Sequence, residues 1–180
     1  MKAIREIGFG EAIRYLFYSL FRIFFKALPF SPLRVLSLYM LGAQIGKNVV
    51  VEDLRLINLH KKGLACLKIG DNCFLGPEAL LDLSESITLE KNVTISSRAA
   101  LLTHTNVGYA DHPLQKILPK KSYPLTIGEN SFVGFGGIIV GPSKIGPNTI
   151  IAAGAVVVKN NRGNEILVGV PAKRLRSFAL

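Results

Sequence analysis

The sequence IGENSFVGFGGIIVGPSKIGPNTIIAAGAV, residues 127–156, places an aliphatic residue at every sixth position. These positions are Ile127, Val133, Ile139, Ile145 and Ile151. An α-helix returns to one face after about 3.6 residues and an extended strand after about two, so neither produces this period. The pattern predicts a solenoid of short strands, in which every side contributes one aliphatic residue to a shared core.

The same frame recurs upstream of this stretch. It continues at Ile45, Val51 and Ile57, at Ile69, Leu75 and Leu81, and at Leu89, Ile95 and Leu101. The fifth place of each hexad is usually small, which suits a tight corner that faces inward. Three hexads would form one triangular coil, and successive coils would stack at about the 4.8 Å spacing of neighbouring strands. The spacing loosens after Ile57 and after Leu81, where we expect loops to leave the corners.

The end of the repeat carries a family resemblance. IGPNTIIAAGAVVVKN (residues 145–160) and LVGVPAKRLR (residues 167–176) resemble the last coils and the proline-containing exit of the hexapeptide-repeat acyltransferases, in particular their saccharide O-acetyltransferase-like branch. The resemblance implies an all-β fold, a left-handed parallel β-helix over residues 45–180. The left hand is implied by the resemblance alone, because the general preference for right-handed crossovers would predict the opposite.

Residues 1–44 lie outside the hexad frame and predict an amphipathic helical extension. Arg14, Tyr18, Arg22 and Lys26 are spaced by four and would form one stripe on a helix whose other faces are aliphatic and aromatic. The charges interrupt the apolar stretch, so we expect neither a transmembrane helix nor a signal peptide. Two interpretations stay open. The helix packs on the first coil or in an oligomer, or it lies in a membrane interface with its basic residues at phosphate level.

Charge and cysteine content restrict the partners. The formal net charge is +10, which suits an anionic membrane surface. No nucleic-acid-binding module is visible in the sequence, so we expect no nucleic-acid partner. The two cysteines, Cys66 and Cys73, do not have the spacing of metal ligands. We expect reduced thiols and no bound metal.

The longest interruption of the repeat, residues 102–126, is where we expect the chemistry. Transfer of an acyl group from a thioester to a hydroxyl needs a base near neutral pH, and histidine has an unperturbed pKa of about 6.5. The resemblance implies that one histidine of this loop is the general base. His104, in THTN, and His112, in DHPL, are the two candidates. Asp82 and Asp111 are alternative orienting carboxylates for the imidazole.

The acyl donor that the resemblance implies is acetyl-CoA. Its pantetheine arm would run along small corners of the solenoid, and its phosphates would meet the basic exit. The residues that the resemblance assigns to the donor are Phe135, Gly136, Ala153, Gly154, Val158, Lys159, Lys173 and Arg176. Charge gives an independent reason for the exit, because a 3′-phosphate and a pyrophosphate favour lysine and arginine beside them.

The resemblance also implies a homotrimer with active sites shared between chains. The favoured function is acetyl-CoA-dependent O-acetylation of a saccharide, free or lipid-linked, in the biosynthesis of cell-surface polysaccharide or glycolipid. Such an enzyme would work in the bacterial cytoplasm or on the inner face of the cytoplasmic membrane. The alternatives are N-acyl transfer to an amino sugar nucleotide or an amino acid, and a non-catalytic membrane-associated scaffold. A zinc hydratase is disfavoured, because His60, His104 and His112 lack the required spacing.

Overall fold

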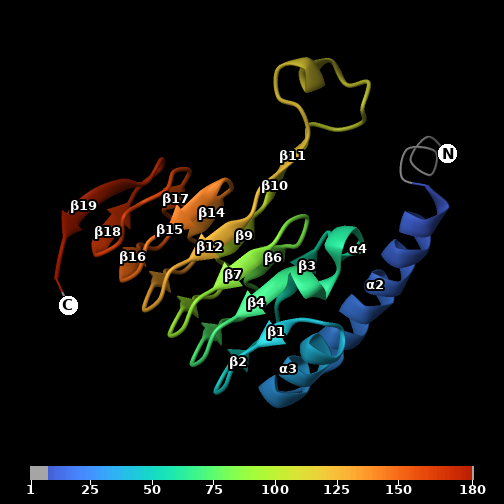
Figure 1. Cartoon of the computed structure of the whole chain (residues 1–180), viewed down its shortest axis with the longest axis horizontal. Helices are drawn as coiled ribbons and strands as arrows, with labels where there is room; N and C mark the ends of the chain where they lie inside the picture. Colours follow the sequence, from blue (N-terminus) through green and yellow to red (C-terminus); the bar gives the residue numbers. More distant parts are fainter. Residues whose placement is uncertain (1–7, 180) are drawn as a thin grey trace.

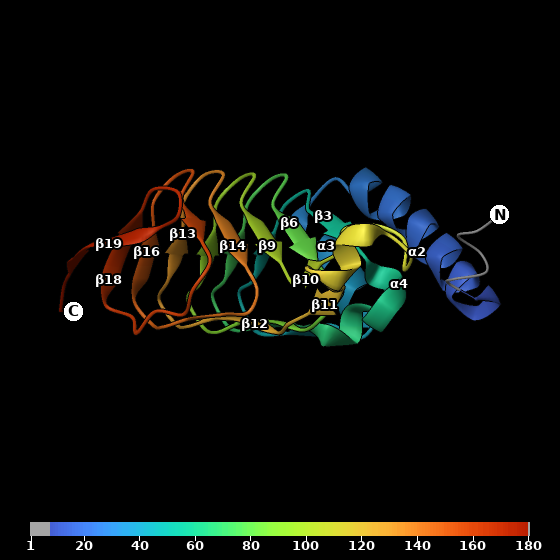
Figure 2. The ribbon, with the colours of Figure 1, turned by 90° about the horizontal axis from the view of Figure 1, so that it is seen from above.

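The computed structural model describes residues 8–179 and has an elongated shape. Figure 1 shows a stack of strand coils that runs along the long axis, with the helices of the N-terminal region at one end and the C-terminus at the other. The view from above in Figure 2 gives the same order of elements. The chain therefore advances along the solenoid and does not return.

Two helices precede the solenoid, α2 (Phe9–Ala27) and α3 (Ser31–Met40). Proline explains the break between them, since a proline inside a helix removes a hydrogen bond and clashes with the preceding turn. Pro32 occupies the first turn of α3, where its missing N–H costs nothing. Neither helix, within residues 8–179, is long and apolar enough to cross a bilayer.

The basic stripe of α2 faces the solenoid and not away from it. The guanidinium of Arg14 donates a hydrogen bond to the Lys61 carbonyl at 3.0 Å, and Phe21 and Phe25 are buried between the helix and the coils. Arg22 and Lys26 line a cavity of about 670 Å³ that also contains carboxylates of the first coils. The polar groups of the coils attract these charges, as in the first of the two interpretations, in which the helix packs on the first coil. The outward face of α2 is apolar instead.

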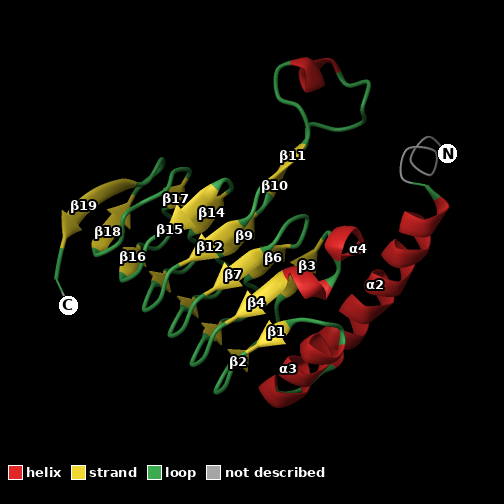
Figure 3. Ribbon diagram, in the orientation of Figure 1, coloured by secondary structure: helices red, strands yellow, loops and turns green. Residues whose placement is uncertain are grey.

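The strands form five triangular coils (Figure 3). Each coil has three short strands, listed here in order: β1 (Gln44–Ile45), β2 (Val50–Val51), β3 (Arg55–Ile57); β4 (Leu67–Ile69), β5 (Phe74–Leu75), β6 (Leu80–Asp82); β7 (Ile87–Leu89), β8 (Thr94–Ile95), β9 (Ala100–Leu102); β12 (Leu125–Ile127), β13 (Phe132–Val133), β14 (Ile138–Val140); β15 (Ser143–Ile145), β16 (Thr149–Ile151), β17 (Val156–Val157). The chain ends in β18 (Glu165–Val168) and the antiparallel β19 (Lys173–Ser177).

Stacking of the coils produces three parallel sheets. Sheet A has the order β1-β4-β7-β12-β15, sheet B contains β18-β16-β13-β8-β5-β2 with β19 at its edge, and sheet C has the order β17-β14-β9-β6-β3. The pairing keeps hexad positions in register, for example Leu81 with Leu101 and Ile139 with Val157. A corner of the solenoid is therefore a column of equivalent residues from successive coils.

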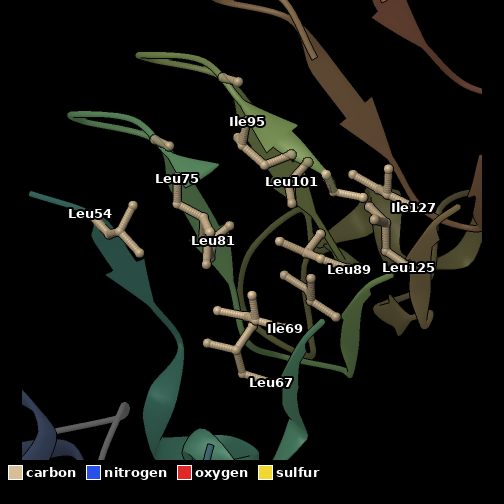
Figure 4. Packing of buried hydrophobic residues seen from close by; sticks show 14 of the residues in the cluster. Leu54, Leu67, Ile69, Leu75, Leu81, Leu89, Ile95, Leu101, Leu125 and Ile127 are labelled. Atoms are coloured by element: carbon tan, nitrogen blue, oxygen red, sulfur yellow. The ribbon is translucent and has the colours of Figure 1, made fainter. Parts of the chain in front are cut away.

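The aliphatic hexad positions form the core, as the period predicts. Figure 4 shows several of them pointing into the space between the sheets. All of Ile69, Leu75, Leu81, Leu89, Ile95, Leu101, Ile127, Val133, Ile139, Ile145 and Ile151 are buried. One position is corrected. Leu56 and not Ile57 pairs with Leu81 and is buried, because the first coil is one residue shorter between β2 and β3 than the hexad frame requires.

The interruptions of the repeat form structures of their own. Between β3 and β4 the chain makes a short helix, α4 (Leu59–Lys62), and a 3-10 turn, η1 (Leu64–Cys66). Between β9 and β12 it leaves the solenoid as an antiparallel ladder of β10 (His104–Thr105) with β11 (Lys121–Ser122). The tip of this loop contains the turn η2 (Pro113–Lys116) and projects from the stack in Figure 1.

A ladder of asparagines holds the corner between sheets A and B, and the hexad analysis did not identify it. Each amide donates to the carbonyl oxygen of the asparagine one coil further on, at distances between 2.8 and 3.2 Å. The members are Asn48, Asn72, Asn92, Asn130, Asn148 and Asn164. All have positive φ, a conformation that asparagine tolerates better than most residues. The ladder stabilises the same tight turn in every coil.

Candidate active site

A histidine and a buried carboxylate meet where two coils leave sheet C. His104 follows β9, and Asp82 is the last residue of β6 in the coil before it. The Nδ1 atom of His104 lies 2.5 Å from Oδ2 of Asp82. Asp82 is fully buried, while 26% of the His104 side chain is exposed. The imidazole is therefore fixed on its protein side and open on the other.

Asp82 is held by donors on both carboxylate oxygens. Its Oδ2 also accepts hydrogen bonds from the backbone N–H groups of Thr103 and His104, both at 3.0 Å. Its Oδ1 accepts from the side-chain amide of Asn58 at 2.8 Å and from the N–H of Ser84 at 3.2 Å. A buried carboxylate with this many donors is rigid and compensated for its loss of water.

The donors decide the charge of Asp82. Burial by itself would raise the pKa of this carboxyl, but hydrogen bonds from His104 and Asn58 outweigh burial and hold the pKa below its usual value. An ionised carboxylate can only accept, so Nδ1 of His104 must carry the proton of that bond. In the neutral imidazole Nε2 is then the unprotonated nitrogen. The geometry prepares His104 to accept a proton at Nε2.

A cavity of about 720 Å³ opens beside His104. Its wall combines the start of α2, the helix α4 and the projecting loop, from its base up to Gln115 in η2. The residues that line it are Glu11, Asn58, His60, Lys61, His104, Asn106, Gly108, Tyr109, Ala110, Gln115, Pro119 and Lys120. The volume lies within the range of about 300–1,000 Å³ that is usual for small-molecule sites. His60 is a partly buried member of this wall.

His112, the second candidate base, lies elsewhere. It is exposed at the tip of the loop, and its Nδ1 accepts a hydrogen bond from the N–H of Leu114 at 3.2 Å, which caps the turn η2. It is not among the residues that line the cavity of His104. Asp111 belongs to the same tip. Of the two orienting carboxylates considered, Asp82 is the one in contact with His104.

The residues expected to bind the donor form two groups. Phe135 and Gly136 occupy the corner between β13 and β14, and Ala153 and Gly154 occupy the same corner one coil later, so these four form one exposed column. Gly136 and Gly154 have positive φ, and the N–H of Gly154 donates to the carbonyl of Phe135 at 2.9 Å. The corner is small enough for a ligand to approach its backbone.

The other expected donor residues lie apart from that column. Val158 and Lys159 follow β17, at the edge of sheet C where His104 follows β9. Lys173 and Arg176 lie on the exposed strand β19. Sheet C separates His104 from the column at Phe135, so one chain does not bring all predicted residues together. Within residues 8–179, no three His, Cys, Asp or Glu side chains are grouped as metal ligands would be.

Four residues of this site were not predicted from the sequence. Asn58 and the backbone of Thr103 donate hydrogen bonds to Asp82, and Lys61 and Lys120 form part of the cavity wall. Asp82 and His104 could have been paired by aligning the hexads, because Leu81 and Leu101 occupy equivalent places in successive coils. Nothing in the sequence indicates that α4 and the loop base face one another.

Comparison with known proteins finds relatives of similar sequence. The family model described as the hexapeptide repeat of succinyl-transferase matches residues 67–97 and 124–159. The galactoside O-acetyltransferase of Escherichia coli is 29% identical over 113 residues, which cover 61% of this chain and 56% of that protein. A protein of the same organism, assigned as the colanic acid biosynthesis acetyltransferase WcaF, is 29% identical over 143 residues, covering 79% and 74%. The chain thus spans little more than half of the first relative.

The solved structures agree on the fold. A galactoside acetyltransferase in complex with coenzyme A superposes with a TM-score of 0.79 at 23% identity, covering 95% of this chain and 84% of the other. The coils are therefore those of a left-handed parallel β-helix, which confirms the expected fold class and hand. In sequence and in fold, the chain is thus similar to hexapeptide-repeat acetyltransferases.

Proposed function

We propose that this protein transfers an acetyl group from acetyl-CoA to a hydroxyl group of a saccharide, with His104 as the general base. The observation that carries the proposal is the imidazole of His104, fixed by the buried carboxylate of Asp82 and open to a cavity of about 720 Å³. The names of the relatives, a galactoside O-acetyltransferase and a colanic acid biosynthesis acetyltransferase, support this chemistry.

The geometry suggests how the two side chains act. Nε2 of His104 accepts the proton of the acceptor hydroxyl while the hydroxyl oxygen attacks the thioester carbonyl carbon. The ionised Asp82 stabilises the imidazolium that forms and keeps the ring in place. The tetrahedral adduct then expels the thiolate of coenzyme A, and the imidazolium returns the proton to that sulfur. His104 and Asp82 end the cycle in their starting states.

The outward faces of the sheets support self-association. Sheet A presents a polar row, in which Lys68, Thr88, Thr126 and Lys144 follow one another in register. Sheet B presents an apolar row instead: Val50, Phe74, Phe132 and Ile150 are each between 37% and 41% exposed. A homotrimer would cover such a row and could place the column at Phe135 of one chain beside His104 of another. The donor site would then be assembled between chains.

The helical extension supports a location at a membrane surface. The outward face of α2 carries Phe9, Ile13, Leu16, Phe17, Leu20, Ile23 and Phe24, all more than half exposed. This face continues along α3 through Leu36 and Met40 and borders a shallow apolar groove of about 530 Å³. An apolar surface of this extent suits the boundary between headgroups and acyl chains. We place the enzyme at the inner face of the bacterial cytoplasmic membrane, in the synthesis of a cell-surface polysaccharide or glycolipid.

A coenzyme A release assay tests the proposed reaction. The purified protein is supplied with acetyl-CoA and a panel of neutral sugars and amino sugars, and each product is treated with hydroxylamine, which cleaves O-acetyl esters and leaves N-acetyl amides intact. We expect acceptor-dependent thiol release and a product that hydroxylamine cleaves. A product stable to hydroxylamine would assign N-acyl transfer instead. Failure of the protein to bind acetyl-CoA in calorimetry would refute the reaction class.

A further inference from the structure

The cavity beside His104 has a basic wall that the proposed proton transfer does not use. His60 and Lys61 come from α4, and Lys120 comes from the base of the projecting loop just before β11. All three line the same cavity as His104. The wall therefore lies where an acceptor would be held while its hydroxyl meets Nε2 of His104.

Both lysines lie on backbone that other contacts hold in place. Arg14 of α2 donates a hydrogen bond to the carbonyl of Lys61 at 3.0 Å. The N–H of Lys120 donates to the side-chain oxygen of Gln115 at 2.9 Å, and the amide of Gln115 donates in turn to Asn106 at 2.9 Å. Two separate parts of the chain are thus tied so that their ammonium groups share one cavity.

The described part of the chain contains no ion-pair partner for either ammonium group. Lys62, the next residue along α4, differs in this respect, because its ammonium group forms an ion pair with Glu85. Among the described residues, no carboxylate lies within ion-pair distance of Lys61 or Lys120. Glu11 is the acidic residue of the cavity wall, and its charge acts from further away.

The protonation energetics agree with this arrangement. Burial lowers the pKa of the Lys61 ammonium, and the neighbouring Lys120 lowers it further, while Glu11 opposes the effect. Burial and Lys61 likewise lower the pKa of His60, and Arg14 and Lys120 act in the same direction. Two like charges beside each other, of which Lys61 is half-buried and Lys120 exposed, are unfavourable without an ion-pair partner, and none is found among residues 8–179. An anion bound between the two lysines would reverse that cost.

We propose that the acceptor carries a phosphate or diphosphate group, and that Lys61 and Lys120 bind this group beside the hydroxyl that His104 deprotonates. This assignment rests on the proposed acetyl transfer and names the substrate class: a phosphate-bearing saccharide. Two separate ammonium groups act as point charges and match a dianion better than a single carboxylate. They would determine which hydroxyl reaches Nε2, and a neutral sugar would bind with lower affinity than a phosphate-bearing one.

Binding of inorganic pyrophosphate tests the site without turnover. The protein is first saturated with desulfo-coenzyme A, so that the donor's own phosphate site is filled. Pyrophosphate is then titrated, with calorimetry for the Kd and the ring signals of His60 and His104 in NMR spectra for the location. The test variant is Lys61→Met/Lys120→Met. The matched control is Lys68→Met/Lys144→Met, which removes the same charge from the polar outward face of sheet A.

We expect pyrophosphate to shift the His60 signal in the wild type and the control, and to bind the test variant about tenfold or more weakly. If the double variant does not fold, as judged by its thermal unfolding, the single variant Lys120→Gln on the exposed loop should show the same weakening. Equal affinity of wild type and variant would overturn the proposal, as would lysine-dependent binding to phosphatidic acid vesicles without binding of pyrophosphate. Because no acetyl transfer is measured, either negative result would leave the role of His104 standing.

Discussion

Replacing Asp82 by asparagine should lower kcat of acetyl transfer about tenfold, and the size follows from its hydrogen bonds. Three donors converge on Oδ2: the N–H groups of Thr103 and His104 and Nδ1 of His104. An asparagine must place its oxygen there, because an amide NH2 would face two backbone donors. Its NH2 then takes the place of Oδ1, where Asn58 can rotate to offer its own oxygen, and only the longer hydrogen bond from the N–H of Ser84 is lost.

The substitution therefore keeps the ring orientation and the tautomer of His104, and what it removes beside the imidazole is the negative charge. A hydrogen bond to a charged group contributes about 1.5–3 kcal/mol and a neutral one about 0.5–1.5 kcal/mol. The lost stabilisation of the imidazolium is thus about 1–1.5 kcal/mol, and 1.36 kcal/mol corresponds to about a tenfold change in rate. Steady-state coenzyme A release gives kcat, and KM for acetyl-CoA should be unchanged.

Two results would refute this reasoning. An unchanged kcat would show that Asp82 does not assist the base. A loss of about 10⁴, the size seen when a triad asparagine enforces the wrong histidine tautomer, would show that the backbone donors do not select the amide orientation. Asp82→Ala serves as a comparison, because it removes orientation and charge together and should lower kcat further than Asp82→Asn.

Three further results are expected from the structure. Because the pKa of Asp82 is lowered in the folded state, its ionisation stabilises the fold above the ordinary pKa of about 3.9, and this contribution is lost as the pH falls through the lower folded value. The difference in unfolding free energy between wild type and Asp82→Asn, from urea titrations, should stay level above about pH 5 and shrink below pH 4. A difference that grows towards acid pH would contradict the sign. In the same assay, Asn92→Val should destabilise the folded protein by about 2–3 kcal/mol, because valine is strained in the left-handed conformation and the two ladder hydrogen bonds are lost. Asn92→Gly should lose only the hydrogen bonds and cost about 1 kcal/mol. Equal costs for the two variants would show that backbone strain is not what selects asparagine. The variant Leu20→Glu/Phe24→Glu should no longer float with anionic liposomes. The control Thr88→Glu/Thr126→Glu, which adds the same charge to sheet A, should still float. Unchanged flotation of the first variant would reject the outward face of α2 as the membrane contact.

The hexad frame predicted the core because its cause is local. The hexad position that Ile139 occupies is buried for the same reason in every coil, so one period describes the sheets, their order and their register. The frame failed at Ile57, where a coil is shortened by one residue and Leu56 takes the inward place. Sequence spacing alone does not show such a change, because both residues are aliphatic.

The candidate site was predictable only where it follows the same register. The pairing of Leu81 with Leu101 brings Asp82 and His104 together, so a histidine at a coil end and a carboxylate one coil earlier are visible in the sequence. The choice between His104 and His112 depends on how the loop folds back, and the basic wall depends on contacts between α4 and that loop. These are tertiary contacts without a sequence period. The helix stripe at Arg14 shows the same limit, since spacing gave the stripe and not the direction that it faces.

The central claim is that His104, and not His112, accepts the proton of the acceptor hydroxyl. Parallel measurements of kcat for His104→Ala and His112→Ala, with an acceptor that the wild type acetylates, test it most directly. General-base catalysis contributes about 10²–10⁴ to a rate, so the account predicts a loss of at least about a hundredfold for His104→Ala. The exposed cap His112 should be replaceable with nearly full activity. Wild-type turnover by His104→Ala, or a hundredfold loss confined to His112→Ala, would contradict it.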